Sequence, residues 1–161
     1  MILAAIDIGS NAARLLITDV TVSDKKTKFE KLNLVRVPLR LGFDVFDKRE
    51  ISAAKAAMFL NCIRSFKYLM DAYEVTHCKA AATSAMRDAR NGPQILETIR
   101  AATGIEIEVI SGDDEAAFIY ENHIAENLDK ENAYLYIDVG GGSKELTCFA
   151  DNRLIFKKSC N

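Results

Sequence analysis

The chain has 161 residues, 49% of them hydrophobic, and a formal net charge of -2 from 21 Lys and Arg against 23 Asp and Glu. This apolar content suits one or two small globular domains. The absence of a basic excess argues against a protein that binds nucleic acid through the phosphate backbone. No stretch approaches the length needed to cross a bilayer, so the sequence predicts a cytoplasmic protein without a membrane partner.

The first part of the chain predicts an α/β domain with a mixed sheet. Apolar residues alternate along three consecutive strands, after which helices and strands take turns. We expect strands at residues 3–7, 13–19, 29–41, 78–82 and 105–110, and helices at residues 52–73, 84–89, 92–104 and 111–128. Pro93 suits the first turn of its helix and Gly104 the C-terminal cap, while Ser111 can cap the last helix.

The rest of the sequence begins the same order again and then stops. Three more strands are expected at residues 133–139, 145–150 and 153–159. We therefore assign residues 1–128 to a first domain and residues 129–161 to the beginning of a second, truncated domain. Three strands in a meander cannot cover both faces of their sheet, so we expect residues 133–159 to self-associate, with a homodimer as the simplest form, or to be disordered.

Two turns near opposite ends of the chain are nearly the same. Each follows an apolar strand that ends in Asp, and each carries glycine and serine: Ile6-Asp7-Ile8-Gly9-Ser10-Asn11 and Ile137-Asp138-Val139-Gly140-Gly141-Gly142-Ser143. Backbone N–H groups in such turns can cradle phosphate oxygens, and the Asp can hold an accompanying divalent metal. Each Asp could instead only cap its turn. The matched placement favours a nucleotide or polyphosphate held between two related halves.

Five segments together resemble the exopolyphosphatase and guanosine pentaphosphate phosphatase family, in order and approximate spacing. They are Ala5-Ile6-Asp7-Ile8-Gly9-Ser10-Asn11, Leu39-Arg40-Leu41-Gly42, Ala82-Thr83-Ser84-Ala85-Met86-Arg87-Asp88-Ala89, Val109-Ile110-Ser111-Gly112-Asp113-Asp114-Glu115-Ala116 and Ile137-Asp138-Val139-Gly140-Gly141-Gly142-Ser143-Lys144-Glu145-Leu146. The glycine turns fit the whole actin, chaperone-ATPase and sugar-kinase superfamily, whereas the third and fourth segments are more specific. The resemblance implies an actin-like fold of two ribonuclease-H-like domains, with a magnesium-dependent hydrolase site in the cleft between them.

The resemblance also implies a catalytic residue, Glu115. A carboxylate at the cleft can orient a water molecule and take its proton during in-line attack on the terminal phosphorus. Asp114 is its nearest competitor. The residues by themselves allow a simpler reading, in which Asp113, Asp114 and Glu115 stabilise the positive end of a helix dipole.

By the same resemblance, Arg87 contacts substrate phosphate, which its forked donors suit. The alternative is a surface ion pair with Asp88 or Glu97. Arg14, on the strand after the first turn, faces the same choice.

The family resemblance completes the set of candidate ligands. The metal site, for Mg2+ or another divalent cation, is expected to use Asp7, Asp138 and Glu145. The phosphate-binding backbone is expected to come from Gly9, Ser10 and Asn11 on one side and from Gly140, Gly141, Gly142 and Ser143 on the other.

Two departures from the family pattern leave this set intact. Ala12 replaces a hydroxyl residue of the first turn, so one contact is lost there. Lys144 stands where a small hydroxyl or apolar residue is usual, and either contacts phosphate or points into solvent.

The sequence therefore predicts a phosphoanhydride hydrolase that releases terminal phosphate from inorganic polyphosphate or guanosine pentaphosphate. A non-catalytic phosphate-ligand sensor would keep the glycine turns without needing Glu115. A sugar kinase or chaperone ATPase would share the turns but leave residues 82–89 unexplained. Because much of the wall facing Glu115 lies outside these residues, we expect the 161-residue chain by itself to have negligible activity.

Overall fold

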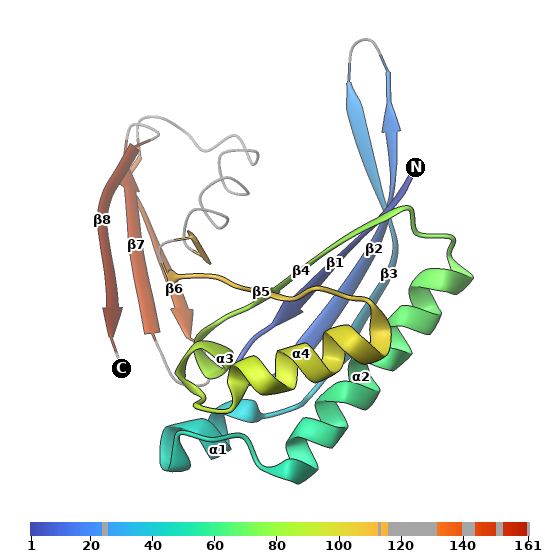
Figure 1. Ribbon diagram of the computed structural model, residues 1–161. Coiled ribbons are helices and arrows are strands. Elements are labelled where there is room, and N and C mark those ends of the chain that lie inside the picture. Colours follow the sequence, from blue (N-terminus) through green and yellow to red (C-terminus); the bar gives the residue numbers. More distant parts are fainter. Residues whose placement is uncertain (24–25, 113, 116–131, 140–143, 151–152, 161) are drawn as a thin grey trace.

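The computed structural model describes residues 1–23, 26–112, 114–115, 132–139, 144–150 and 153–160. The first part forms β1 (Ile2–Ile8), β2 (Ala13–Val22), β3 (Thr27–Val37), α1 (Leu41–Lys48), α2 (Ala53–Ala72), β4 (His77–Ala82), α3 (Ser84–Asp88), α4 (Gly92–Thr103) and β5 (Glu108–Val109). The later part forms β6 (Tyr134–Val139), β7 (Lys144–Ala150) and β8 (Arg153–Cys160). Figure 1 shows the two groups of strands as separate sheets.

The first sheet has five strands in the order β3-β2-β1-β4-β5. Strands β1, β2 and β3 form an antiparallel meander, whereas β4 pairs parallel to β1 and β5 pairs parallel to β4. The second sheet is antiparallel, in the order β6-β7-β8. The predicted fold class is confirmed: a mixed five-stranded sheet with helices, followed by the first strands of a second sheet.

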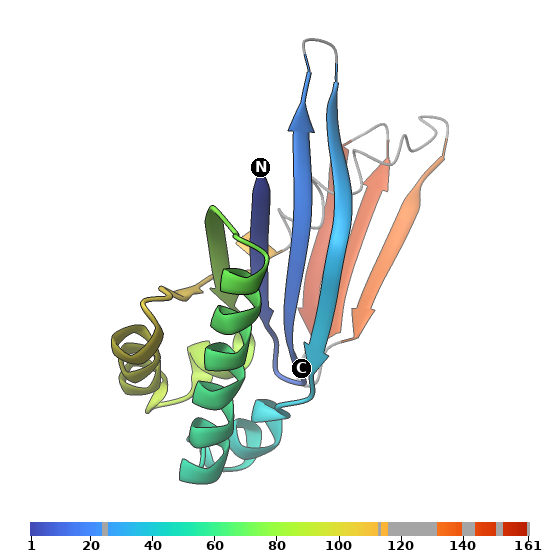
Figure 2. The ribbon, with the colours of Figure 1, turned by 90° about the vertical axis from the view of Figure 1, so that its right-hand side faces the viewer.

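Along β1 and β2, buried residues alternate with more exposed ones, so the buried side chains lie on one face of the five-stranded sheet. Ile6 and Ile8 of β1 and Leu15 of β2 are at most 2% exposed, and they pack with Phe59 and Phe66 of α2. The intervening positions on β1 and β2 face the other way. Figure 2 shows the helices on one side of this sheet and the three-stranded sheet on the other. The hydrophobic core therefore lies between the sheet and the described helices.

The prediction that the third strand continues to residue 41 was wrong. Strand β3 ends at Val37, and the short helix α1, which was not expected, begins at Leu41. Pro38 has no N–H to continue the ladder, and Arg40 adopts a left-handed conformation with φ 54. The apolar alternation continues because Leu39 and Leu41 are buried, at 2% and 0% exposure, away from the strand.

The strand expected at residues 105–110 is also shorter than predicted. Only Glu108 and Val109 pair with β4. Ile105 and Ile107 are nevertheless buried in the core. Their alternation therefore reflects burial, which here occurs without strand pairing.

Most helix boundaries agree with the sequence signals. Helix α2 follows Ser52, and α4 begins at Gly92 with a proline in its first turn. Gly104 ends α4 with φ 71, the left-handed conformation that glycine adopts most readily. Within the described parts of the chain, no helix is long and apolar enough to cross a membrane.

The junction of α3 and α4 requires glycine at position 92. A Cβ there would lie 2.6 Å from the Met86 carbonyl oxygen. We expect Gly92→Ala to lower the free energy of unfolding by about 1–3 kcal/mol, because backbone must move to relieve the overlap. Denaturant titration checks this, with Gly112→Ala as control, since a Cβ at Gly112 meets no described atom within 4 Å. Equal stability of the two variants would show that the junction yields freely.

Candidate functional site

The candidate site lies where three parallel strands end. Strands β1, β4 and β5 run in the same direction, so their carboxyl ends meet at one edge of the sheet. Ligands of open α/β sheets bind at this edge. Asp7 lies near the end of β1, Arg87 follows β4 on α3, and Glu115 follows β5. Figure 1 shows α3 beside this edge. The topology thus brings three predicted site residues to one end of the sheet.

The first turn is tied to the start of α3. The Thr83 backbone N–H donates to the Ile8 carbonyl at 3.0 Å, and the Ser10 and Ser84 hydroxyl oxygens lie 2.8 Å apart. Ser10 is only 7% exposed, which is unusual for a serine in a turn. The Gly9 N–H donates to the Ala12 carbonyl at 3.0 Å and closes the turn. The turn is therefore fixed by its neighbours before any ligand binds.

A second set of contacts holds the same turn from the side of α1. The Arg40 N–H donates to the Asn11 carbonyl, and the Gly42 N–H donates to the Ser10 carbonyl, each at 2.8 Å. A Cβ at Gly42 would lie 3.1 Å from the Ser10 Cβ, so glycine permits this close approach. Through these contacts, the segment from Leu39 to Gly42 supports the first turn. Its sequence did not indicate this role.

A partly buried ion pair contacts the backbone of Arg40, which is in a left-handed conformation. The Lys55 ammonium donates to the Arg40 carbonyl and lies 2.9 Å from a carboxylate oxygen of Asp44. The Ser52 N–H donates to the other Asp44 oxygen at 2.9 Å. Hydrogen bonding from Ser52, followed by the Lys55 ammonium, lowers the pKa of the Asp44 carboxyl to about 2. The network thus links α1 and α2 to the backbone that supports the turn.

Asp7 and Arg14 form an ion pair across β1 and β2. The Arg14 Nη1 lies 2.8 Å from an Asp7 carboxylate oxygen, and the two side chains are 52% and 50% exposed. Residues so exposed remain accessible to ligands from solvent. A carboxylate oxygen is the ligand type that Mg2+ prefers, so Asp7 fits one metal ligand. Among the described residues, however, no three acidic, His or Cys side chains gather as a metal site.

The other proposed ligands belong to the second sheet. Asp138 and Glu145 are register partners on β6 and β7. Their side chains, the loop from Gly140 to Ser143 and the side chain of Lys144 lie outside the described residues. The metal site and the second phosphate-binding turn therefore stay predictions of the sequence.

Arg87 connects α3 to the segment that carries Glu115. Its Nη1 donates to the Ile110 carbonyl at 3.1 Å, in a partly buried contact. The suggested ion pair with Glu97 is absent from the described contacts, because Glu97 pairs instead with Arg100 at 2.9 Å. The Ile110 N–H in turn donates to the Ala82 carbonyl at the end of β4. Arg87 thus lies against the backbone that immediately precedes Ser111.

The two candidate acids after Ser111 have different environments. The Ser111 hydroxyl donates to an Asp114 carboxylate oxygen at 2.7 Å, and the Asp114 N–H donates to the Ser111 hydroxyl oxygen at 3.1 Å. This reciprocal pair caps the first turn of a helix, as the sequence predicted for Ser111. The Glu115 N–H donates to the Ser111 carbonyl, and Glu115 is half-buried. Asp114 therefore serves the cap, which favours Glu115 over Asp114 as the candidate base.

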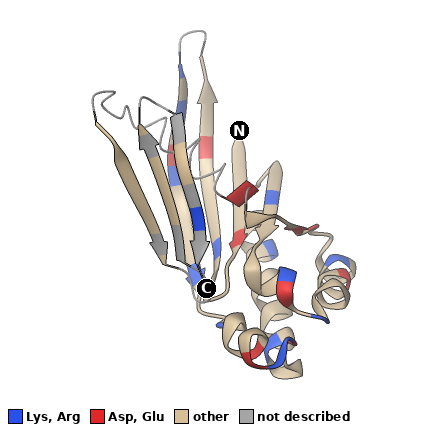
Figure 3. Cartoon of the chain, turned by 90° about the vertical axis from the view of Figure 1, so that its left-hand side faces the viewer, with Lys and Arg blue, Asp and Glu red and all other residues tan. Residues whose placement is uncertain are grey.

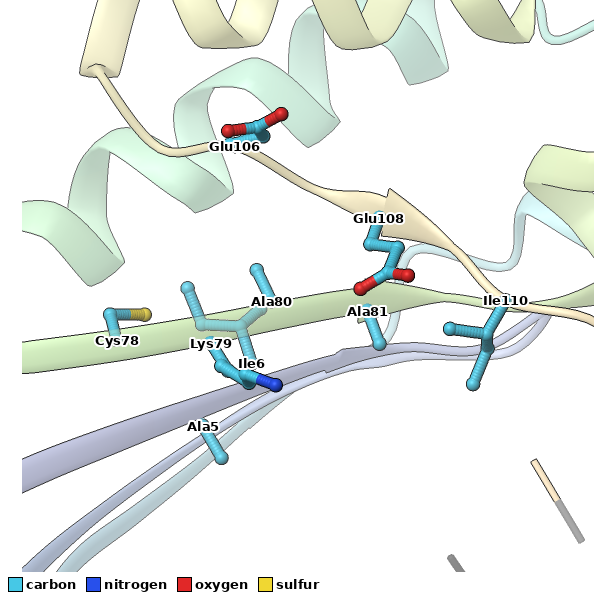
Figure 4. Close-up of a pocket in the computed structure, with 9 residues that line it drawn as sticks. All are labelled: Ala5, Ile6, Cys78, Lys79, Ala80, Ala81, Glu106, Glu108 and Ile110. Carbon is cyan, nitrogen blue, oxygen red and sulfur yellow. The ribbon is translucent and has the colours of Figure 1, made fainter. Parts of the chain in front are cut away.

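A surface hollow of about 650 Å³ lies beside β4 and β5, away from these residues. Figure 4 shows Lys79 from β4, together with Glu106 and Glu108 from the adjoining segment, on its walls, with Glu108 above Ala81. None of the predicted site residues lines it. The hollow is distinct from the candidate site at the strand ends.

Comparison with known proteins identifies the family. The model of the Ppx/GppA phosphatase family matches residues 20–161. This chain belongs to the Ppx/GppA phosphatase family. Its resemblance to exopolyphosphatases and guanosine pentaphosphate phosphatases is thereby confirmed.

Solved structures of the Ppx/GppA family superimpose closely. An exopolyphosphatase from Cytophaga hutchinsonii gives a TM-score of 0.89 at 29% identity, covering 99% of this chain and 50% of that one. The Aquifex aeolicus family member gives 0.77 at 28% identity, covering 99% and 51%. A Bacteroides thetaiotaomicron protein with an actin-like ATPase fold, of unknown function, gives 0.57 at 10% identity, covering 99% and 70%. The last likeness shows the fold only.

A curated relative also carries this region. A bifunctional 3-dehydroquinate synthase/phosphatase from Fusobacterium nucleatum is 32% identical over 152 residues, which is 89% of this chain and 22% of that protein. The chain therefore spans about half the length of the Cytophaga hutchinsonii and Aquifex aeolicus proteins and less of this curated relative.

The Asp44 network predicts a specific pH dependence. The carboxyl has a lower pKa in the folded chain, about 2, than its ordinary value of 3.8. Its contribution to stability is therefore full above pH 3.8 and is lost as the pH falls toward 2. In urea titrations, we expect Asp44→Asn to be less stable than the parent at neutral pH, with a difference that shrinks over this range. A difference that is constant with pH would exclude Asp44 as the titrating group.

Proposed function

We propose that this chain supplies part of the active site of a phosphoanhydride hydrolase, which releases terminal phosphate from inorganic polyphosphate or guanosine pentaphosphate. The chain belongs to a phosphatase family, and one of its similar structures is an exopolyphosphatase. One contact carries the assignment to these residues, the 3.1 Å hydrogen bond from Arg87 to the Ile110 carbonyl. It brings a guanidinium, the side chain best suited to phosphate, to the segment that carries Glu115.

In this proposal the backbone and the cations hold the substrate. Gly9, Ser10 and Asn11 offer backbone groups to phosphate oxygens, from a turn that is already fixed by its neighbours. A preorganised turn of this kind loses little entropy when a phosphate binds. Arg87 adds charge-assisted hydrogen bonds to the phosphate nearest Glu115. The loop from Gly140 to Ser143 is proposed to grip the substrate from the opposite side.

The chemical step is assigned to Glu115. Its carboxylate orients a water molecule and accepts a proton as the water oxygen attacks the terminal phosphorus in line. The new P–O bond forms as the bond to the bridging oxygen breaks, and the shortened phosphate chain leaves with the electron pair. Asp114 does not compete for this role, because its carboxylate accepts the hydrogen bonds that cap the helix.

The proposed metal ligands are Asp7, Asp138 and Glu145. A bound Mg2+ would offset the negative charge of the phosphates and so favour attack by water. Asp7 has the right oxygen donor and sufficient exposure. In this proposal it gives up its ion pair with Arg14 when it binds the metal ion. A cytoplasmic location and a homodimer are further parts of the proposal that come from the sequence.

Replacement of the base is the first test of the mechanism. In the protein encoded by the complete gene, Glu115→Gln should lower the rate of phosphate release by two or more orders of magnitude, with substrate affinity nearly unchanged. Phosphate release from polyphosphate measures the first, and titration calorimetry the second.

Asp114→Asn is the matched control for Glu115→Gln. The amide oxygen of asparagine can still accept the hydrogen bonds from Ser111, so this variant should stay close to the parent in rate and in stability. Turnover of Glu115→Gln equal to that of the parent would remove Glu115 from the mechanism. Binding of polyphosphate by a parent that releases no phosphate would favour a sensor over an enzyme.

The role of Arg87 is tested by affinity and stability together. Arg87→Ala should weaken polyphosphate binding at least tenfold, while loss of the bond to Ile110 costs about 1–2 kcal/mol of unfolding free energy. Arg100→Ala is the control, because Arg100 forms only an exposed pair with Glu97. Unchanged affinity with lowered stability would make Arg87 a structural residue.

A further inference from the structure

One row of residues crosses the face of the five-stranded sheet that lies opposite the described helices. Register pairs join Asp7 to Arg14 and Arg14 to Arg36 on one side, and Asp7 to Ala81 and Ala81 to Glu108 on the other. Residues paired in this way share a face of the sheet. The buried residues of β1 and β2 occupy the alternate positions, so the row lies on the face opposite the described helices. Figure 3 shows the charged residues of this region from the side of the three-stranded sheet.

The charges along this row are separated by sign. Arg36 and Arg14 lie on β3 and β2, whereas Asp7 and Glu108 lie on β1 and β5. Arg14 is held by Asp7 at 2.8 Å, but no carboxylate among the described residues pairs with Arg36. Arg36 is exposed and directly opposite Arg14. Like charges in directly opposed positions destabilise a sheet, so an anion that binds between the two arginines stabilises the arrangement.

We infer that Arg14 and Arg36 form a second phosphate subsite, which binds the tail of a polyphosphate chain whose terminal group lies beside Asp7. The inference rests on the proposed function. Two guanidinium forks on adjacent strands can each donate a pair of hydrogen bonds to phosphate oxygens. The subsite lies on an ordered sheet, so the binding groups are positioned in advance.

The row also fixes the direction of the bound chain. Glu108 at the β5 end repels a polyanion, whereas the arginines at the β2 and β3 side attract it. The tail therefore extends from Asp7 across β2 toward β3. Arg36 is two strand spacings from Asp7, roughly 10 Å, so it contacts only chains long enough to reach it. Arg36 is thus a determinant of chain-length preference, a role that its place in an alternating strand did not suggest.

Kinetics on two chain lengths tests the subsite in the protein encoded by the complete gene. For long-chain polyphosphate, Arg36→Ala should raise KM about tenfold with kcat unchanged, whereas KM for tripolyphosphate should stay within about twofold of the parent. Arg36→Lys keeps the charge but loses the forked donors, so its KM for long-chain polyphosphate should lie between those of the parent and Arg36→Ala. Arg64→Ala removes an exposed arginine from α2, on the helical side of the sheet, and should match the parent on both substrates.

A binding measurement separates this inference from the proposed function. With a chelator present to prevent turnover, long-chain polyphosphate should raise the Tm of the parent and of Arg64→Ala, but raise that of Arg36→Ala clearly less. Without ligand, Arg36→Ala should not lower Tm, because it removes a like-charge contact. An equal rise in all three proteins, or an equal rise in KM on both chain lengths, would overturn the subsite. A parent that binds long chains without releasing phosphate would overturn only the proposed hydrolysis.

Discussion

The backbone of the turn after β1 satisfies only part of its hydrogen bonding within the turn, and the candidate site is built around the neighbouring segments that supply the remaining partners. The carbonyls of Ser10 and Asn11 accept bonds from the segment before α1, and the Ser10 hydroxyl contacts Ser84 at the start of α3. Buried backbone groups without partners are costly, so these contacts are constraints on the fold. They also hold the proposed phosphate-binding turn in one conformation and place α3, which carries Arg87, beside it.

The candidate site has different side chains on the side of α3 and on the side of β2 and β3. On the side of α3, Arg87 contacts the backbone before Ser111, and the reciprocal bonds of Ser111 and Asp114 set the helical turn that includes Glu115. On the side of β2 and β3, the register of the strands places Arg14 and Arg36 beside Asp7. A phosphate chain bound along this edge would meet the proposed base at one end and a pair of arginines at the other. Catalysis and chain-length preference are thus assigned to different parts of one sheet.

Groups outside the proposed site support it through backbone contacts. Lys55 and Asp44 lie on α2 and α1, yet their pair fixes the carbonyl of Arg40, whose N–H supports the turn. Gly92 allows α3 and α4 to approach closely. We expect substitution of these residues to shift Arg87 or the turn through the backbone, because close-packed elements transmit small displacements.

The sequence by itself determined the fold class, most of the element order and the family, because alternation, helix caps and glycine turns are local signals. It also singled out Asp7, Arg87 and Glu115, since these lie in motifs. It could not show that α1 begins at Leu41, because Leu39 and Leu41 are buried whether or not they belong to a strand. Only the tertiary structure decided that Arg87 contacts the backbone before Ser111 and that Arg36 lies opposite Arg14. Strand register and hydrogen bonds between distant segments depend on which segments meet in space, and neither is encoded in the spacing of residues along the chain.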